Sequence, residues 1–178
     1  MMQEAWFRDF GLSRESLAAG HWWTFLTYSL LHGAWWHAIG NLLGLWVLGR
    51  HVLDEYGVGV FFGLFWTGVV AGGLAQIAFG DDGILIGLSG GLMALCAAAG
   101  FLWGDRRVSI GLGPWRFGVV RGRYLGWGVL LASLGCALLG HWLPSGAMDI
   151  GHWCHAGAAV AGVLAIGLAW LAAPEVRV

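Results

Sequence analysis

The chain of 178 residues is strongly apolar, since 58% of its residues are hydrophobic and only 11% are charged. Soluble domains carry roughly a quarter charged residues, so this chain cannot cover a water-facing surface and must be solvated largely by lipid. A net charge of −1 without any lysine excludes a basic nucleic-acid-binding surface, and three cysteines in apolar runs (Cys96, Cys136 and Cys154) do not make a disulfide framework.

Apolar runs divide the chain into segments of membrane-spanning length. A helix that crosses a bilayer needs about 20 mostly apolar residues. Five runs of this kind follow one another, at about 35–53, 58–79, 84–103, 119–143 and 150–172. Short polar breaks part them, including Asp54–Glu55, a Gly-Asp-Asp-Gly turn at 80–83, a longer gap at 104–118, and Pro-Ser-Gly at 144–146. The sequence therefore predicts an all-α polytopic membrane protein with five transmembrane helices.

We expect one membrane domain at 21–172, preceded by an N-terminal segment at 1–20 and followed by a short cytoplasmic tail at 173–178. The arginines give the orientation, because most of them lie near the end of the first run, between the third and fourth runs and at the opening of the fourth, and at the end of the chain. With alternating spans these places share one side, which the positive-inside rule makes the cytoplasm. Arg8 and Arg14 then lie on the outer side, together with the beginnings of the first, third and fifth runs.

Polar side chains cluster at these outer beginnings. His37 and Asn41, four residues apart, share one helical face at the start of the first run, while Ser89 and His155 lie early in the third and fifth runs. Counted along helices from the preceding breaks, all four lie roughly 6–12 Å below the outer edge. Polar groups inside a membrane are costly and usually functional. A serine, histidines and an asparagine at one depth supply a nucleophile, a base and oxyanion donors for acyl transfer.

Each of these residues also has a purely structural interpretation. A serine in a glycine-rich helix is usually a packing residue, and a histidine near a helix end usually bonds to the backbone. The stretch Gly87–Gly91 matches the Gly-x-Ser-x-Gly elbow of hydrolases, but that motif requires a strand–turn–helix, and 84–101 is one apolar run. We therefore expect a continuous helix and no elbow. The shared depth favours the catalytic interpretation, which no single residue would do alone.

Three stretches carry a family resemblance. They are 21–41, with the sequence His-Trp-Trp-Thr-Phe-Leu-Thr and a later Leu-His-Gly-Ala-Trp-Trp-His that leads to Asn41; Gly87-Leu88-Ser89-Gly90; and 150–162, with Trp153-Cys154-His155. In this order and spacing they resemble the rhomboid family of intramembrane serine proteases. The resemblance covers about residues 10–172 and is specific only when the motifs are taken together.

The resemblance implies a rhomboid-like helical bundle with a Ser89–His155 dyad and no acidic third member. His155 would take the proton of Ser89, which attacks a peptide carbonyl, and His37 and Asn41 would hold the oxyanion together with the Ser89 N–H. Further support of the site is implied for His32, Gly87 and Gly90. The implied substrates are single-pass transmembrane helices, which must unwind near the outer interface because an intact helix hides its carbonyls. No cofactor or metal is expected.

The sequence departs from the family pattern in several places. Thr24 stands where an arginine often anchors the first loop, and Met93 stands where a tyrosine often stacks on the catalytic histidine. Apart from these departures, Gln76, near the outer end of the second run, is expected to help hold water near the site. The first of the family's usual six transmembrane helices has no counterpart in 1–20. We expect the natural start to lie upstream, and the alternative is a minimal five-helix version.

The expected function is that of an intramembrane serine endopeptidase in the bacterial inner membrane, with a site that opens to the periplasmic side. The alternative is a catalytically inactive rhomboid-like protein that binds transmembrane helices, as Thr24 and Met93 suggest. A third hypothesis, a haem or metal protein with His37 and His155 as ligands, leaves Ser89 and Asn41 without a role. The sequence names neither the substrate nor the oligomeric state.

Overall fold

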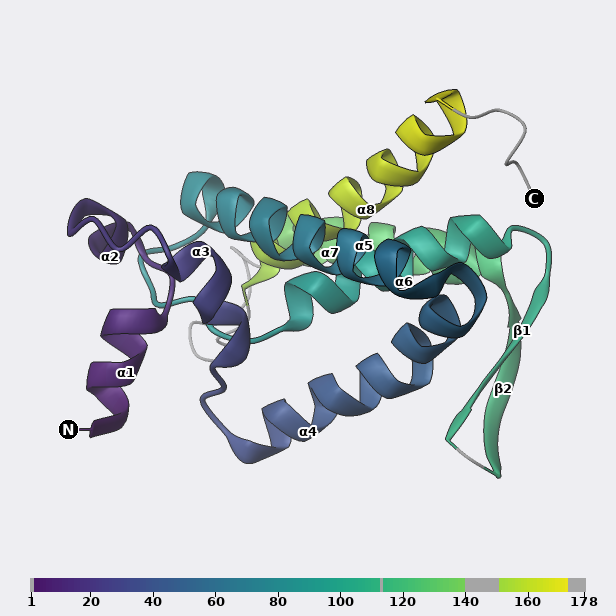
Figure 1. The fold of residues 1–178 in the computed structure, drawn as a ribbon, viewed down its shortest axis with the longest axis horizontal. Coiled ribbons are helices and arrows are strands. Elements are labelled where there is room, and N and C mark those ends of the chain that lie inside the picture. The colour runs from purple at the N-terminus through teal and green to yellow at the C-terminus, as the bar shows by residue number, and fades with distance from the viewer. Residues whose placement is uncertain (1, 113, 140–150, 173–178) are drawn as a thin grey trace.

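The chain was analysed as a computed structural model that describes residues 2–112, 114–139 and 151–172. Its N-terminal part contains short helices, namely α1 (Met2–Phe10), α2 (Arg14–Ala18), α3 (Thr24–Thr27) and a 3-10 turn, η1 (Tyr28–Leu30). The longer elements follow: α4 (Trp35–Gly44), a π-helical turn η2 (Leu45–Gly49), α5 (Arg50–Phe79), α6 (Ser89–Trp103), β1 (Arg107–Leu112), β2 (Trp115–Arg121), α7 (Gly122–Leu139) and α8 (His152–Ala172). Figure 1 shows the short helices at one end of the molecule and the two strands at the other.

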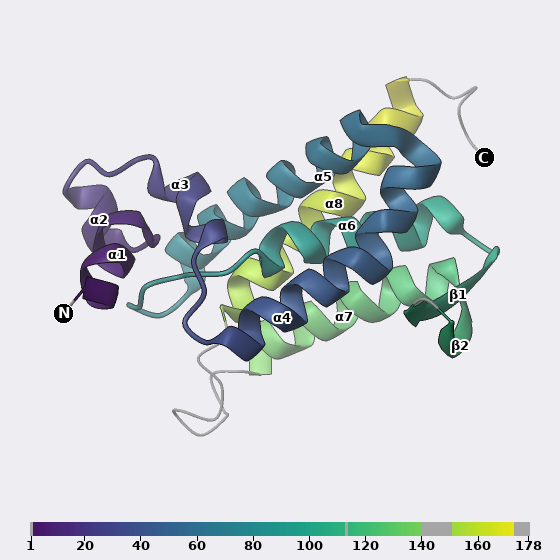
Figure 2. The same ribbon diagram turned by 60° about the horizontal axis from the view of Figure 1, so that its bottom comes forward.

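The predicted all-α polytopic membrane fold is confirmed. Three stretches among the described residues are long and apolar enough to cross a membrane, Trp35–Phe79, Gly122–Leu139 and His152–Ala172, and α6 is a shorter apolar helix. The first stretch has 45 residues and is divided at Gly57, whose φ of 83° favours a residue without a Cβ. The break predicted between residues 53 and 58 thus falls at Gly57, within α5, and the part of α5 after Gly57 runs antiparallel to α4 (Figure 2).

The third helix begins later than predicted. The continuous helix expected from residue 84 is wrong, because α6 starts at Ser89. The preceding residues are extended: the N–H groups of Leu12 and Leu85 each donate to the other residue's carbonyl, at 3.1 and 2.8 Å. Gly87 then turns the chain with a φ of 111°. Backbone pairing with a distant segment therefore overrides the apolar pattern of 84–88.

The polar gap between the third and fourth runs forms an antiparallel hairpin, which the sequence reasoning did not predict. Strands β1 and β2 pair with Arg107 opposite Arg121 and Val108 opposite Val120. The alternation of the strands turns Val108 into the bundle, where it is buried, while Val119 on the other face stays exposed. The fourth run therefore starts as a strand, and its helix α7 begins at Gly122.

Some predicted boundaries lie outside the described residues. These are the end of the fourth run at 140–143, the break at 144–146, the start of the fifth run at 150 and the tail at 173–178.

Close backbone contacts hold α5, α6 and α8 together at the centre of the bundle. A Cβ on Gly68 of α5 would lie 2.8 Å from the Gly90 carbonyl oxygen of α6. A Cβ on Gly162 of α8 would lie 2.9 Å from the Cα of Ala94, also in α6. In membranes, where lipid removes the hydrophobic drive between helices, small residues of this kind allow the tight packing that stabilises a bundle.

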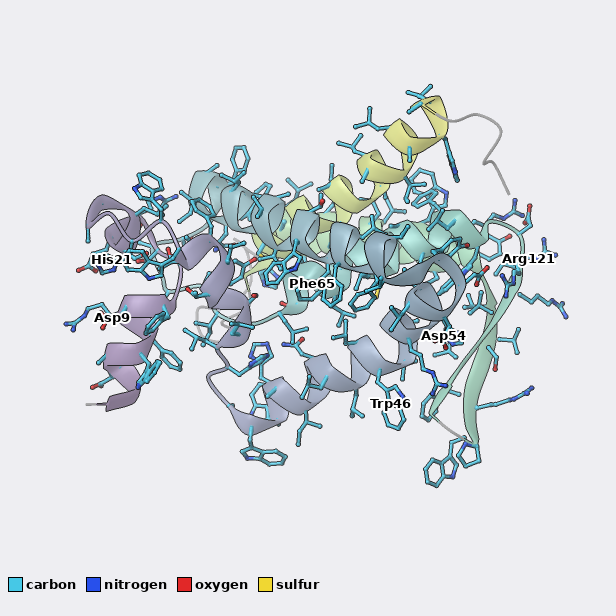
Figure 3. All side chains as sticks on the ribbon, viewed as in Figure 1. Asp9, His21, Trp46, Asp54, Phe65 and Arg121 are labelled. Carbon is cyan, nitrogen blue, oxygen red and sulfur yellow. The ribbon has the colours of Figure 1, made fainter. Side chains whose placement is uncertain are left out.

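Large apolar side chains cover the outside of the bundle. In Figure 3, Phe65 lies within the bundle, whereas Trp46 points away from it; Phe65 is buried and Trp46 is half exposed. Trp35, at the start of α4, is 75% exposed. An apolar surface of this extent requires lipid around it, as expected for an integral membrane protein.

Candidate active site

Ser89 is the first residue of α6 and follows directly on the turn at Gly87. The Gly87 N–H donates to the carbonyl of Tyr28 at 2.9 Å, which ties this turn to the N-terminal helices. At a helix start the backbone N–H groups have no partner within the helix. Ser89 thus presents its hydroxyl beside unpaired N–H donors at one end of the bundle.

His155 approaches Ser89 from the neighbouring helix α8. Its Nε2 lies 2.7 Å from the Ser89 Oγ, within hydrogen-bonding distance. The His155 N–H donates to the Gly151 carbonyl at 3.1 Å, which fixes the first turn of α8 below the ring. No carboxylate bonds to the His155 ring in the part of the chain that the structure describes. The geometry is that of a serine whose hydroxyl proton can pass directly to an imidazole.

Side chains of α4 border the Gly87 turn. A Cβ on Gly87 would lie 2.8 Å from Cε1 of His37 and 3.6 Å from Nδ2 of Asn41, so these two side chains occupy the space beside the glycine. Gly87 therefore serves in two ways, through its positive φ and through the room it leaves for His37 and Asn41. Both side chains thus lie beside a residue that precedes Ser89 by two positions in the sequence.

His32 supports Asn41. The Asn41 Nδ2 lies 3.1 Å from the Nε2 of His32, and the rings of His32 and His37 meet edge to face at 5.1 Å. Burial, and less strongly the neighbouring His37, lower the pKa of His32. A neutral His32 has a ring nitrogen that can accept a hydrogen bond from the Asn41 amide, which leaves the second N–H of that amide available.

Gly90 leaves room for the neighbours of the site. A Cβ at this position would lie 3.0 Å from the Cys154 Sγ and 3.2 Å from the hydroxyl oxygen of Tyr28. Tyr28 is fully buried, and its hydroxyl donates to the carbonyl of Val69 at 2.7 Å. Gly90 thus allows α8 and the N-terminal helices to approach the start of α6 together.

Gln76, in the last turns of α5, holds the start of α8. Its Oε1 accepts a hydrogen bond from the Cys154 N–H at 3.2 Å, one residue before His155. The role in holding water that the sequence suggested stays a prediction. The contact with the backbone of α8 was not foreseen, because the two residues are 78 positions apart.

The N-terminal helices are anchored without an arginine at position 24. Thr24 is fully buried, and its hydroxyl donates to the His21 carbonyl at 2.7 Å. A guanidinium comes instead from Arg14, which donates to the carbonyls of Ile77 and Gly80, each at 3.0 Å. The sequence had placed Arg14 on the outer side without giving it a role.

Met93 faces α7. Its sulfur accepts from the Ser133 hydroxyl at 3.9 Å, and both residues line an open, mostly apolar surface groove of about 420 Å³ between α6 and α7. The packing of Met93 on the His155 ring, offered as a substitute for the usual tyrosine, stays a prediction.

The structure thus brings Ser89, His155, His37, Asn41 and His32 to one end of the bundle. Their predicted depths rested on continuous helices from the outer edge, which was wrong for Ser89, since 84–86 is extended and the chain turns at Gly87 before α6 begins. The residues nevertheless meet because α4, α6 and α8 all begin at this end (Figure 1).

Fold and site together define a polytopic helical membrane protein with a serine–histidine pair between two of its helices. A family model described as the Rhomboid domain matches residues 19–172, and the chain belongs to the rhomboid family.

Several characterised proteins are similar to parts of the chain. It is 34% identical to Rhomboid protease GluP of Bacillus subtilis over 91 residues, 47% of this chain and 18% of that protein. It is 42% identical to mouse (Mus musculus) Rhomboid-related protein 2 over 74 residues, 41% of this chain and 24% of the relative. It is 29% identical to the chloroplastic Rhomboid-like protein 11 of Arabidopsis thaliana over 91 residues, 49% of this chain and 32% of the relative. The matches therefore span less than a third of each relative's length.

Proposed function

We propose that this chain is an intramembrane serine endopeptidase in which Ser89 is the nucleophile and His155 the general base. The observation that carries the proposal is the 2.7 Å contact between the Ser89 Oγ and the His155 Nε2. A nucleophile within hydrogen-bonding reach of a base is the arrangement that activates a serine. Membership of the rhomboid family and the similarity to a protein named as a rhomboid protease support it.

The reaction follows from this contact. The His155 Nε2 takes the proton of the Ser89 hydroxyl as the oxygen attacks a peptide carbonyl carbon, and a tetrahedral oxyanion forms. When the C–N bond breaks, the imidazolium gives its proton to the leaving amine, and an ester to Ser89 remains. Water, deprotonated by His155, then attacks the ester, and the acid and the free Ser89 hydroxyl are released.

The oxyanion is stabilised by donors on two helices. The Ser89 N–H lies at the start of α6, where the backbone donors have no intrahelical partner. The Asn41 amide retains one N–H beyond its contact with His32. His37 lies against Gly87, next to the same place. Removing one donor of an oxyanion hole typically costs on the order of 10²–10³ in kcat.

The substrates we propose are transmembrane helices cut near the outer, periplasmic face of a bacterial inner membrane. The arginine-rich hairpin end lies opposite the site, which supports this orientation through the positive-inside rule. A stable helix keeps its carbonyls in hydrogen bonds, so the segment to be cut must unwind before it reaches Ser89.

The test is cleavage of a model transmembrane substrate by the purified protein in liposomes. Ser89→Ala and His155→Ala should abolish cleavage and labelling by a serine-reactive fluorophosphonate. Ser133→Ala is the matched control, because Ser133 is a buried helical serine whose hydroxyl donates to the Met93 sulfur. Wild-type protein that neither cleaves nor takes the label would refute the proposal and favour an inactive, helix-binding member of the family.

A further inference from the structure

We propose that Arg14 is a positioning residue that holds the Ser89 segment in register with His155, an inference that rests on the proposed function. Its guanidinium bonds to the end of α5, from which the chain leads through 80–88 to Ser89. The described contacts of Arg14 are with Ile77, Gly80 and Asp82 and not with Ser89 or His155, so an effect on catalysis would act through the backbone.

Arg14 stands on a rigid support. It is the first residue of α2, whose capping box is complete, since the Ser13 and Ser16 hydroxyls each accept from the other residue's N–H at 3.0 Å. The buried Ser16 hydroxyl also lies 3.4 Å from that of Thr24. α2 is therefore fixed to α3, and the position of the Arg14 side chain follows from that of the whole N-terminal unit.

The partners of Arg14 are backbone carbonyls at a helix end, which lack a hydrogen-bond donor within the helix. The Ile77 and Gly80 carbonyls lie at the C-terminal end of α5, where the last carbonyls have no partner within the helix. A cation there also interacts favourably with the helix dipole. Two different nitrogens of the planar arginine fork donate to the two carbonyls, whereas a lysine would have to serve both from a single nitrogen.

The same stretch of α5 is linked to both members of the serine–histidine pair. Gln76 accepts the Cys154 N–H and so holds the start of α8, which carries His155. Beyond Gly80 the chain pairs through Leu85 with Leu12, two residues before Arg14, and reaches Ser89. The end of α5 is thus the common support of nucleophile and base, and Arg14 joins it to the segment that pairs with Leu85.

Two ion pairs show how the hydrogen bonds of Arg14 to α5 can be tested apart from the effect of its charge. Arg14 also pairs with Asp82, whose side chain is 85% exposed, and such exposed pairs contribute little. Arg8, from the same N-terminal region, pairs with its neighbour Asp9 and is 71% exposed. Arg8→Gln therefore removes the same charge without touching α5, which makes it the matched control.

The experiment measures two quantities in proteoliposomes for wild type, Arg14→Gln, Arg14→Lys, Asp82→Asn and Arg8→Gln. The first is hydrogen exchange of the backbone at 80–88, and the second is the kcat and KM for a transmembrane substrate. In Arg14→Gln we expect faster exchange of the Leu85 and Gly87 amides and a kcat lowered on the order of ten- to a hundredfold with KM unchanged, since small misplacements of reacting groups have effects of this size. Arg14→Lys should be intermediate, and Asp82→Asn and Arg8→Gln should match wild type.

Exchange in α6 and α7 reports whether each variant is folded. Faster exchange confined to 80–88, with a lowered kcat, supports the proposal. An unchanged kcat per folded molecule in Arg14→Gln overturns it, as does an equal loss in Arg8→Gln. If the wild-type protein cleaves nothing, both the proposed function and the catalytic role of Arg14 are refuted. The exchange data still decide separately whether Arg14 stabilises the backbone at 80–88.

Discussion

Gly162 provides the sharpest test of how the bundle positions the site. In Gly162→Ala the added methyl would lie 2.9 Å from the Ala94 Cα and 3.0 Å from its carbonyl carbon. Both atoms belong to the backbone of α6, which cannot rotate aside as a side chain can. Because ordinary carbon–carbon contacts begin near 3.5 Å, α6 and α8 would have to separate by about half an ångström.

The cost can be compared with the gain. Overpacking a tight core typically costs about 1–3 kcal/mol, whereas replacing a helical glycine by alanine gains about 1 kcal/mol. We therefore expect Gly162→Ala to lower the free energy of unfolding by up to about 2 kcal/mol. Gly162 lies seven residues, about 10 Å, beyond His155 along α8, so the shift also lengthens the 2.7 Å contact with Ser89. Cleavage should fall on the order of tenfold or more.

Gly167 supplies the control on the same helix, because a Cβ there would meet nothing within 4 Å. Gly167→Ala should leave activity unchanged and keep or slightly raise stability, the opposite sign from Gly162→Ala. Thermal unfolding in detergent and substrate cleavage in liposomes measure the two quantities. If both variants melt and cleave alike, the close approach of α6 and α8 does not govern the site and the reasoning is refuted.

Two further predictions concern the supports of the site. Gln76→Leu removes the acceptor of the Cys154 N–H, so the free energy of unfolding should fall by about 1–3 kcal/mol in thermal melts; an unchanged melting temperature would contradict this. Because the pKa of His32 is lowered by burial and by His37, the unfolded chain binds this proton more readily than the folded one. The contribution of His32 to stability is therefore present above about pH 6.5 and is lost as the pH falls. Between pH 6.5 and 5 the melting temperature of His32→Gln should fall less steeply than that of the wild type. Parallel curves for the two proteins would argue against this role of His32.

Much of the bundle could be predicted from the sequence, because lipid imposes a strong length requirement on every spanning helix. The runs at 35–79 and 152–172 correspond to helices in the structure, and the break near Gly57 was placed to within a few residues. The hairpin was missed although alternating residues at 115–119 carried a strand signal. Attention to apolar runs alone assigned Val119 and Val120 to a helix.

The site could be predicted only in part. Depth brought Ser89 and His155 together, since both lie near the beginnings of helices that enter from one side. The start of α6 could not be found in this way, because the extended course of the chain at Leu85 depends on pairing with Leu12, more than 70 positions earlier. The residues that contact Arg14 and Gln76 are similarly far from them in the sequence, and no local sequence pattern predicts these contacts.

The glycine contacts between α5, α6 and α8 also bear on how such a chain can change over evolutionary time. Where one backbone lies against another, as at Gly68 and Gly162, almost every substitution adds atoms that have no space. On the lipid side, as at Leu168 of α8, one apolar side chain can replace another at little cost. Sequence drift should therefore be confined to the lipid-facing side of each central helix. In related chains the substituted positions should recur with the period of a helix, and the residues on the packed side should remain small.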